Sequence, residues 1–529
     1  MRPTFLKLCL LFFFSAATLL LAWSLSDFAV LWSAGNLNYW FMAALFGAFL
    51  IAAFKALRGV DFMALKSKLL SEKWAIVLLL ALSAFLQVNE PHRAKVLYDE
   101  DVICGVAYKM HEDRMAMYPA RMHFCDGQLH VFTSAVDKRP VFFPFVLSTV
   151  HDLTGYRTAN VFVLNAVLTF ALLSALYYWV KPTAGPAGAA AAVLLLAGLP
   201  LLAQCATGAG FEVMNIFLIA AFALAGRRYL ARQGSDGLDL FICVALMLAS
   251  TRYESALYLF ALAAIVLFKW IREKRVTMTW FFAVSPLFMF PSILCNRIFV
   301  STDGFLQLKT EGAFFSMSYL HGNLDRALFY LFSAPGDNQT SSLLLSIVGV
   351  LSLTALAALT GSILSRRRKP NPDFPVLLPV LAVALVTSFI SLINNSGQWD
   401  DPIIARYSLP LLLVMVMVFA AVLHFFVAYR TVRMLAPAVA AVWLVCFAAP
   451  QMARHEMTDI LPCSQESAFM HKWQLENSTV QDLFVDQSAL GIILAGRPAV
   501  AFSHANAAPW KLQAVLDAGL YQNVYVCER

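Results

Sequence analysis

Long apolar runs recur along almost the whole of this sequence, and they restrict the folds that the chain can adopt. A helix that crosses a bilayer needs about 20 apolar residues, and thirteen runs come close to that length. Only 13% of the residues are charged, whereas a soluble domain typically carries about 25%. We therefore predict an all-α polytopic membrane protein. The runs lie near residues 5–24, 38–57, 74–89, 158–180, 186–204, 211–227, 237–251, 254–269, 279–299, 341–364, 375–394, 405–428 and 434–451.

Lysine and arginine are concentrated in alternate loops. When the N-terminus is placed inside, every inner loop is basic and the short outer loops are almost free of Lys and Arg, in agreement with the positive-inside rule. This distribution accounts for the net charge of +7, so we exclude nucleic-acid binding. Three large segments then face outward, near 90–157, 300–340 and 452–529. We interpret the first apolar run as a retained helix, with a cleaved signal peptide as the alternative.

Three regions of the chain differ in composition and in predicted secondary structure. Residues 1–73 predict a helix pair with a basic inner loop, and residues 74–451 predict the transmembrane catalytic domain. From residue 452 the chain becomes more polar, and strand-like "DLFVD", "PAVAF" and "NVYVCER" alternate with helical segments. This alternation predicts a small exterior α/β domain over 452–529 with βαβαβ order. We expect it to cap the membrane domain; holding an acceptor is the alternative.

Four of the nine cysteines fall in the outward-facing segments. Cys104 and Cys125 share the first of these segments, and Cys463 and Cys527 share the last. Paired cysteines outside a membrane predict two disulfides in an oxidising compartment. The alternative is that each behaves as an unpaired, small apolar residue.

Three consecutive carboxylates, those of Asp99, Glu100 and Asp101, stand near the start of the first outer segment. Apolar residues follow them at helical spacing from Val102 to Met110. A helix that continues from the acids would lay this apolar stripe on the membrane surface. One acid is enough to complement the dipole of a helix N-terminus, so three in a row indicate a functional role for at least one.

Further charged groups are predicted at the same outer face, while the middles of the spans contain almost no ionisable residue. An ion-coupled transporter needs such residues near the midplane of the bilayer. An enzyme at the outer interface instead needs carboxylates as bases and arginines for a phosphate. We therefore favour an enzyme. The outer groups are Lys138, Arg139, Glu212, Arg252, Glu254, Asp400, Asp401 and Arg406, with His321 on a predicted interfacial helix.

Four short motifs follow one another along the chain. They are Asp99-Glu100 before a helix, "DKRPVFFPFVL" with Lys138 and Arg139, Thr251-Arg252 at the outer end of a span, and "ARYSLP" with Arg406 and Tyr407. In this order, and on this side of the membrane, they resemble the GT-C superfamily of glycosyltransferases, specifically its aminoarabinose transferase and protein O-mannosyltransferase branch. The resemblance covers about residues 74–430.

This resemblance implies that a sugar moves, with inversion, from a polyprenyl-phosphate donor to a glycan, lipid or protein acceptor. We predict that Asp99 is the general base and that Glu100 orients the sugar. Four cationic side chains are predicted to stabilise the phosphate leaving group, namely Arg252, Arg406, Lys138 and Arg139. The remaining predicted substrate contacts are Asp101, Glu212, Tyr253, Glu254, Tyr407 and His321.

No close spacing of His, Asp and Glu requires a metal, so we predict no firm cofactor; a divalent cation with Glu212 as a ligand is the alternative. The predicted partners are the lipid-linked donor, the acceptor and membrane lipids. The predicted location is a bacterial inner membrane with the active site facing the periplasm. Because fold does not fix function, three other readings stay open: a transporter of lipid-linked substrates, a non-catalytic scaffold, or an oligosaccharide ligase with a diphosphate-linked donor.

Overall fold

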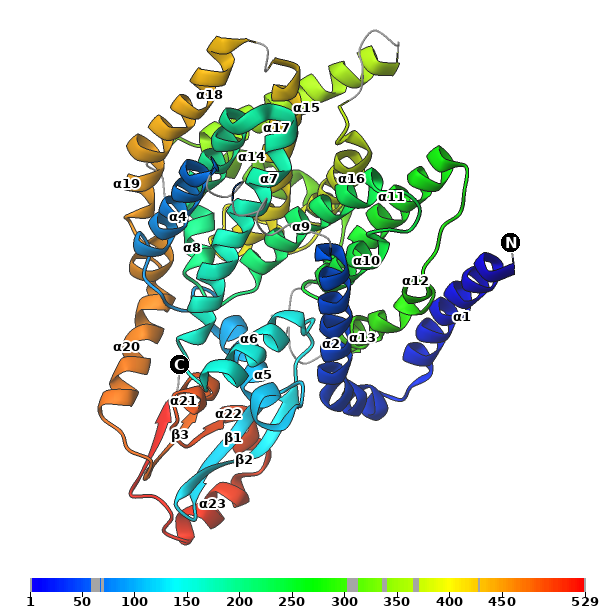
Figure 1. The fold of residues 1–529 in the computed structure, drawn as a ribbon. Helices are drawn as coiled ribbons and strands as arrows, with labels where there is room; N and C mark the ends of the chain where they lie inside the picture. Colours follow the sequence, from blue (N-terminus) through cyan, green and yellow to red (C-terminus); the bar gives the residue numbers. More distant parts are fainter. Residues whose placement is uncertain are drawn as a thin grey trace.

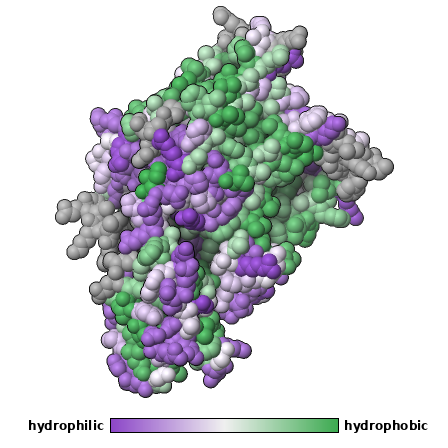
Figure 2. Space-filling model, turned by 90° about the vertical axis from the view of Figure 1, so that its left-hand side faces the viewer, coloured by the Kyte–Doolittle hydropathy of each residue, from purple (hydrophilic) through white to green (hydrophobic). Residues whose placement is uncertain are grey.

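The protein is mostly helical, and its helices form a membrane bundle above a smaller lobe that contains a sheet (Figure 1). The computed structural model describes residues 2–58, 67, 71–301, 313–334, 340–364, 371–426 and 429–527. Within these residues, ten helices are long and apolar enough to cross a membrane. The predicted all-α polytopic fold is confirmed. Figure 2 shows an extended hydrophobic surface on the upper part of one face, with hydrophilic groups beside it and over the lower lobe.

The membrane helices follow the predicted apolar runs. Two of those runs, 158–180 and 186–204, join in one long helix that is kinked at Gly185, where φ is 72° and a proline follows. The long helices are α1 (Arg2–Ser24), α2 (Asp27–Leu57), α7 (Asn160–Ala197), α9 (Glu212–Ala231), α11 (Tyr258–Glu273), α12 (Trp280–Val284) continuing to α13 (Phe290–Ser301), α15 (Leu343–Leu364), α16 (Phe374–Leu392), α17 (Leu409–Leu423) and α18 (Arg430–Trp443). Two apolar helices are shorter, α4 (Lys73–Val88) and α10 (Leu238–Ala249).

The centre of the bundle is formed by α7, α9 and α17. Nearly every side chain of α17 is buried, and this helix packs against α7, α9, α15 and α16. Helix α8 (Pro200–Ala206) follows α7 and leads the chain back toward the start of α9. This arrangement brings the first turns of α9 and α17 to the same end of the bundle, where the charged residues of the candidate site gather.

The small sheet combines two distant parts of the chain. Its five strands lie in the order β2-β1-β4-β3-β5. Strands β3 (Asp482–Asp486), β4 (Ala499–Ala501) and β5 (Asn523–Cys527) are parallel, which confirms the predicted βαβαβ unit. Strands β1 (Met117–Cys125) and β2 (Gln128–Val136) form a hairpin that the prediction missed, and β1 pairs antiparallel with β4. The C-terminal unit therefore shares one sheet with the first outer segment.

The helix predicted after the three acids is present as α5 (Leu97–Asp113), but its apolar stripe does not lie on a membrane surface. Val102, Val106 and Met110 are at most 1% exposed, because α5 packs against α6 (Phe142–Thr154), β1 and α21 (Ala489–Leu494). A Cβ at Gly105 would lie 3.0 Å from side-chain atoms of both the hairpin and α21. The acids of α5 are thus held by protein packing.

The predicted disulfide between Cys104 and Cys125 is wrong, because both residues are free thiols. Cys104 is on α5 beside the start of β1, whereas Cys125 ends that strand, about 20 Å farther along at roughly 3.3 Å per residue. The side chain of Cys463 lies outside the described part of the structure, so its pairing with Cys527 stays a prediction.

Candidate active site

Asp99 lies between two arginines, Arg406, which is buried, and Arg139, whose side chain is 14% exposed. It occupies the first turn of α5, Arg139 precedes α6, and Arg406 stands in the short helical turn that opens α17. Arg406 Nη2 donates to Asp99 Oδ2 at 2.7 Å, and Arg139 donates to Asp99 Oδ1. Both carboxylate oxygens thus accept charge-assisted hydrogen bonds, which are roughly twice as strong as neutral ones. Arg139 also donates to Asp137 at 2.8 Å.

Glu212 links Arg406 to a second arginine, Arg252. Glu212 is the first residue of α9, and its Oε1 accepts from Arg406 Nη1 at 3.1 Å. Arg252 Nη1 lies 3.9 Å from that oxygen, and Arg252 Nε lies 2.5 Å from Glu254 Oε1. The side chains of Arg252 and Glu212 are each 4% exposed. Predicted site residues from five separate segments, those of Asp99, Arg139, Glu212, Arg252 and Arg406, therefore form one largely buried ionic network.

Aromatic rings border this network. The guanidinium carbon of Arg252 lies 4.6 Å from the ring centre of Tyr407, a cation–π distance. Tyr253 Oη donates to the carbonyl oxygen of Lys138 at 2.5 Å, and Lys138 Nζ lies 5.2 Å from the ring centre of Phe299. The two predicted tyrosines and Lys138 are therefore positioned around the arginines.

Glu100 is buried behind Asp99, against a glycine-rich loop. Its Oε2 accepts from the backbone N–H of Lys95 at 2.5 Å. A Cβ at Gly210 would lie 3.2 Å from Glu100 Oε1 and 2.1 Å from Glu212 Oε2, so a side chain at this position would require the Glu212 carboxylate to move. Asn165 Nδ2 fixes the loop by donating to the carbonyl oxygen of Gly210 at 3.0 Å.

The two neighbouring acids of α5 have opposite pKa shifts. Burial raises the pKa of Glu100 to about 8, and the charge of Glu212 adds to that rise. Burial would also raise the pKa of Asp99, but Arg139 and Arg406 outweigh it and hold the pKa below its ordinary value. Neutral pH therefore leaves Asp99 charged and Glu100 protonated. Opposite shifts in adjacent titratable groups are typical of acid–base sites.

Two further charged residues behind Glu100 were missed by the sequence analysis. Lys95 is 4% and Glu90 is 3% exposed. Lys95 Nζ donates to the carbonyl oxygen of Pro91 at 2.7 Å and lies 3.6 Å from Glu90 Oε2. Burial raises the pKa of Glu90 to about 7 although Lys95 opposes the rise. The only signal in the sequence was the run of acids and bases in "NEPHRAKVLYDED", of which the sequence analysis used Asp99, Glu100 and Asp101.

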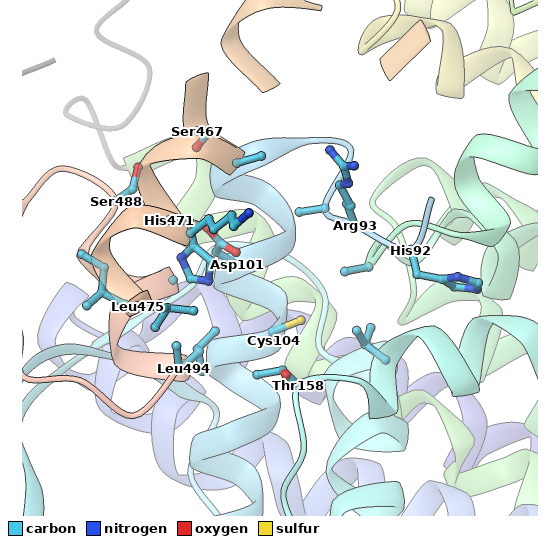
Figure 3. Close-up of a pocket in the computed structure, with 18 of the residues that line it drawn as sticks. His92, Arg93, Asp101, Cys104, Thr158, Ser467, His471, Leu475, Ser488 and Leu494 are labelled. Carbon is cyan, nitrogen blue, oxygen red and sulfur yellow. The ribbon is translucent and has the colours of Figure 1, made fainter. Parts of the chain in front are cut away.

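Two predicted substrate contacts lie apart from the ionic network. His321, on α14 (Leu320–Phe332), has a side chain that is 92% exposed and lies 3.2 Å from Asp325. Its predicted contact with substrate at this centre is not supported, because α14 directs it to the surface. Asp101 points into a cavity on the other side of α5 (Figure 3). In the described part of the chain, no group of three or more His, Cys, Asp or Glu is placed to hold a metal ion.

Part of the chain that holds these residues matches a known protein family. Residues 138–294 match the model of the dolichyl-phosphate-mannose-protein mannosyltransferase family. The predicted resemblance to GT-C membrane glycosyltransferases is confirmed. The matched segment includes Arg139, Glu212 and Arg252 of the ionic network. Comparison with curated proteins gives no match.

Several solved structures are also similar to the chain. ArnT from Cupriavidus metallidurans bound to undecaprenyl phosphate is 14% identical, with a TM-score of 0.46 over 86% of this chain and 90% of that one. Its apo form is 12% identical, with a TM-score of 0.48 over 85% and 92%. The Archaeoglobus fulgidus oligosaccharyltransferase tethered with an acceptor peptide is 11% identical, with a TM-score of 0.42 over 80% and 63%. These identities are too low to transfer the roles of individual residues.

Proposed function

We propose that the chain is a glycosyltransferase that moves a sugar from a polyprenyl-phosphate donor to an acceptor hydroxyl, with inversion at the anomeric carbon. The observation that carries this proposal is Asp99 held between the two arginines Arg139 and Arg406. Arginine binds phosphate through a planar pair of donors. One site thus offers a candidate base and the cations that a phosphate leaving group needs, at the end of an apolar helix bundle that suits a lipid tail.

The ion pairs of Asp99 suggest how donor binding activates the base. A carboxylate whose two oxygens already accept bonds from arginines is a weak base. The incoming donor phosphate competes for the same guanidinium groups of Arg139 and Arg406, and it thereby releases Asp99. Donor binding therefore precedes activation of the acceptor.

The chemical step then follows from these positions. Asp99 takes the proton of the acceptor hydroxyl, and the acceptor oxygen bonds to the anomeric carbon. The bond from that carbon to the phosphate oxygen breaks, and its electron pair stays on the phosphate. Arg139, Arg252 and Arg406 stabilise this growing charge, which is usually the largest contribution to rate enhancement.

Basic residues support an orientation with the site outside. Helix α9 has Glu212 at one end, and at its other end Lys269 Nζ donates to the carbonyl oxygen of Tyr229 at 2.7 Å. Arg272 Nη2 donates to that of Leu230 at 2.6 Å. Since basic residues favour the cytoplasmic side, the proposed active site faces the periplasm of a bacterial inner membrane.

Glu100→Gln is expected to change the pH dependence more than the rate at neutral pH. Above about pH 8 Glu100 loses its proton, and a second buried charge beside Glu212 repels the donor phosphate. We therefore expect kcat/KM of the native enzyme to fall above this pH, and Glu100→Gln to remove the fall with activity at pH 7 within a few-fold. The measurement is kcat/KM against pH for both proteins. A loss of activity by orders of magnitude at pH 7 would instead require Glu100 as a carboxylate.

Mass spectrometry of polyprenyl-phosphate sugars and surface glycans tests the proposed function in the host. We compare cells that carry the native chain, no chain, or the chain with Asp99→Asn. Accumulation of one lipid-phosphate sugar and loss of one glycan modification in both defective strains is the expected result. If only the deletion strain changes, the lipid-linked-substrate transporter or scaffold becomes the better reading.

A further inference from the structure

One buried asparagine of the membrane bundle lies outside the ionic network and bonds to the loop beside it. Asn165 is in the second turn of α7 and is fully buried. Its Nδ2 donates to the carbonyl oxygens of Gly208, at 2.8 Å, and of Gly210, at 3.0 Å. A carboxamide nitrogen has two N–H groups, so both are used. Asn165 therefore ties α7 to the glycine-rich loop, residues 207–211, between α8 and α9.

The oxygen of the same carboxamide does not explain the asparagine. Asn165 Oδ1 is buried and has no hydrogen-bond partner among the described residues, which is unfavourable for an acceptor. The reverse orientation of the amide would place this oxygen against two carbonyl oxygens. The two donors toward the loop therefore account for an amide side chain at this position of a spanning helix.

The opposite side of the loop meets the carboxylates of the candidate site. A Cβ at Gly208 would lie 3.0 Å from Glu100 Oε1, and one at Gly210 would lie 3.2 Å from the same oxygen. Gly210 also meets the carboxylate of Glu212. The loop thus fills the space between the Asn165 amide and two acids, and a shift of the loop would change the surroundings of both.

Glu212 connects the loop to the proposed base. It is the first residue after the loop, and its Oε1 accepts from Arg406 Nη1 at 3.1 Å. Arg406 Nη2 in turn donates to Asp99 Oδ2 at 2.7 Å. Arg406 is therefore oriented by two carboxylates, and one of them stands directly on the loop.

We propose that Asn165 is a positioning residue for sugar transfer, an inference that rests on the proposed function. By holding the loop, Asn165 keeps Glu212 on Arg406 and keeps Glu100 covered. Without the amide, the two glycine carbonyl groups lose their buried donors, and the loop moves to where these groups find others. The groups that react stay present but are displaced.

Displacement of the loop has a specific effect on the pH dependence. Burial raises the pKa of Glu100 to about 8. Water that enters behind a displaced loop reduces this rise, so Glu100 loses its proton at lower pH and the alkaline fall in kcat/KM begins earlier. The other titratable groups around Glu100 are Lys95, Cys104, Cys205, Glu212 and Arg406. A substitution of Asn165 retains all of them.

The test compares Asn165→Ala with Asn323→Ala in the full chain in nanodiscs. Asn323, on α14, is a matched control because it is also buried and its Nδ2 donates to two carbonyl oxygens of a different loop, those of Leu392, at 2.9 Å, and Asn394, at 2.8 Å. Both variants should lower the melting temperature to a similar extent. Only Asn165→Ala should lower kcat, by about 10- to 100-fold as for a misplacement of about 1 Å, and move the alkaline limit down by about one pH unit or more.

The kinetics use the lipid-phosphate sugar and the acceptor that the mass-spectrometric comparison identifies, and hydrogen exchange gives a readout that needs no activity. Backbone amides of residues 207–211 should exchange faster in Asn165→Ala than in the native chain, and at the native rate in Asn323→Ala.

The inference is overturned if Asn165→Ala keeps the native kcat and alkaline limit, or if Asn323→Ala changes both to the same extent. If Asn165→Ala does not fold, Asn165→Ser and Asn323→Ser make the same comparison, because serine leaves a smaller cavity. A native chain without transferase activity rejects the proposed function instead, and hydrogen exchange then still decides whether Asn165 holds the loop.

Discussion

Asp99→Asn is expected to lower kcat by about two to four powers of ten, the range for loss of a general base. The amide cannot accept the proton of the acceptor hydroxyl. It also leaves Arg139 and Arg406 without the carboxylate that now neutralises them. Arg139 keeps Asp137 and Arg406 keeps Glu212, but each arginine has lost one of its two carboxylates. The donor phosphate then has one competitor fewer, so we expect KM for the donor to fall while kcat collapses. Steady-state kinetics with the chain in nanodiscs measure both quantities.

Asp113→Asn is the matched control for this experiment. Asp113 is in the last turn of the same helix, its side chain is 46% exposed, and it pairs with Lys109, whose side chain is 9% exposed. This pair stands at the other end of α5 from Asp99, so its loss leaves the arginines around Asp99 in place. Native activity is expected for this control. If Asp99→Asn keeps native kcat, Asp99 is not the base. If kcat and donor affinity fall together, the carboxylate instead organises the site.

Arg406→Gln is expected to destabilise the protein as well as inactivate it. Arg406 is 8% exposed and holds both Asp99 and Glu212. Removing one partner of a buried ion pair costs about 3–5 kcal/mol, because the remaining charge is left uncompensated. The free energy of unfolding of the full chain in detergent is the measurement. The double variant Arg406→Gln with Glu212→Gln should recover part of the loss, since it removes one of the stranded charges.

Arg326→Gln is the control that separates the effect of losing any arginine from the effect of losing a buried one. Arg326 pairs with Asp400 at 2.6 Å, but its side chain is 49% exposed, so we expect a loss of less than about 1 kcal/mol. Equal destabilisation by Arg406→Gln and Arg326→Gln would contradict the importance of burial at Arg406. A double variant no more stable than Arg406→Gln would show that Glu212 is not the stranded charge.

The sequence predicted the membrane helices and most of the charged centre for separate physical reasons. Apolar runs specify spanning helices because unsatisfied backbone polar groups are too costly in lipid. Arg252 and Arg406 stood out because an outer loop and a span edge otherwise lack cations. The structure brings both to Glu212.

Other parts of the site depended on contacts that no local pattern encodes. The β1–β2 hairpin has a visible turn signal at Asp126-Gly127, yet its pairing with β4 joins segments more than 350 residues apart. The opposite directions of Asp99 and Asp101 depend on how α5 rotates against β1 and α21. No local pattern marks Glu90 and Lys95 as buried, because only the packed fold buries them.

The shared sheet has a consequence for biosynthesis. Strand β4 is the bridge between the hairpin and the C-terminal strands, and it is translated after all the membrane helices. Until β4 and α21 have been synthesised, one edge of β1 has no partner strand for its backbone hydrogen bonds, and α5 is not packed against α21. The carboxylates that we propose for catalysis are therefore set in place only when the last part of the chain has been released and docked. A chain that terminates early would enter the membrane with its helices intact and its reaction centre unfinished.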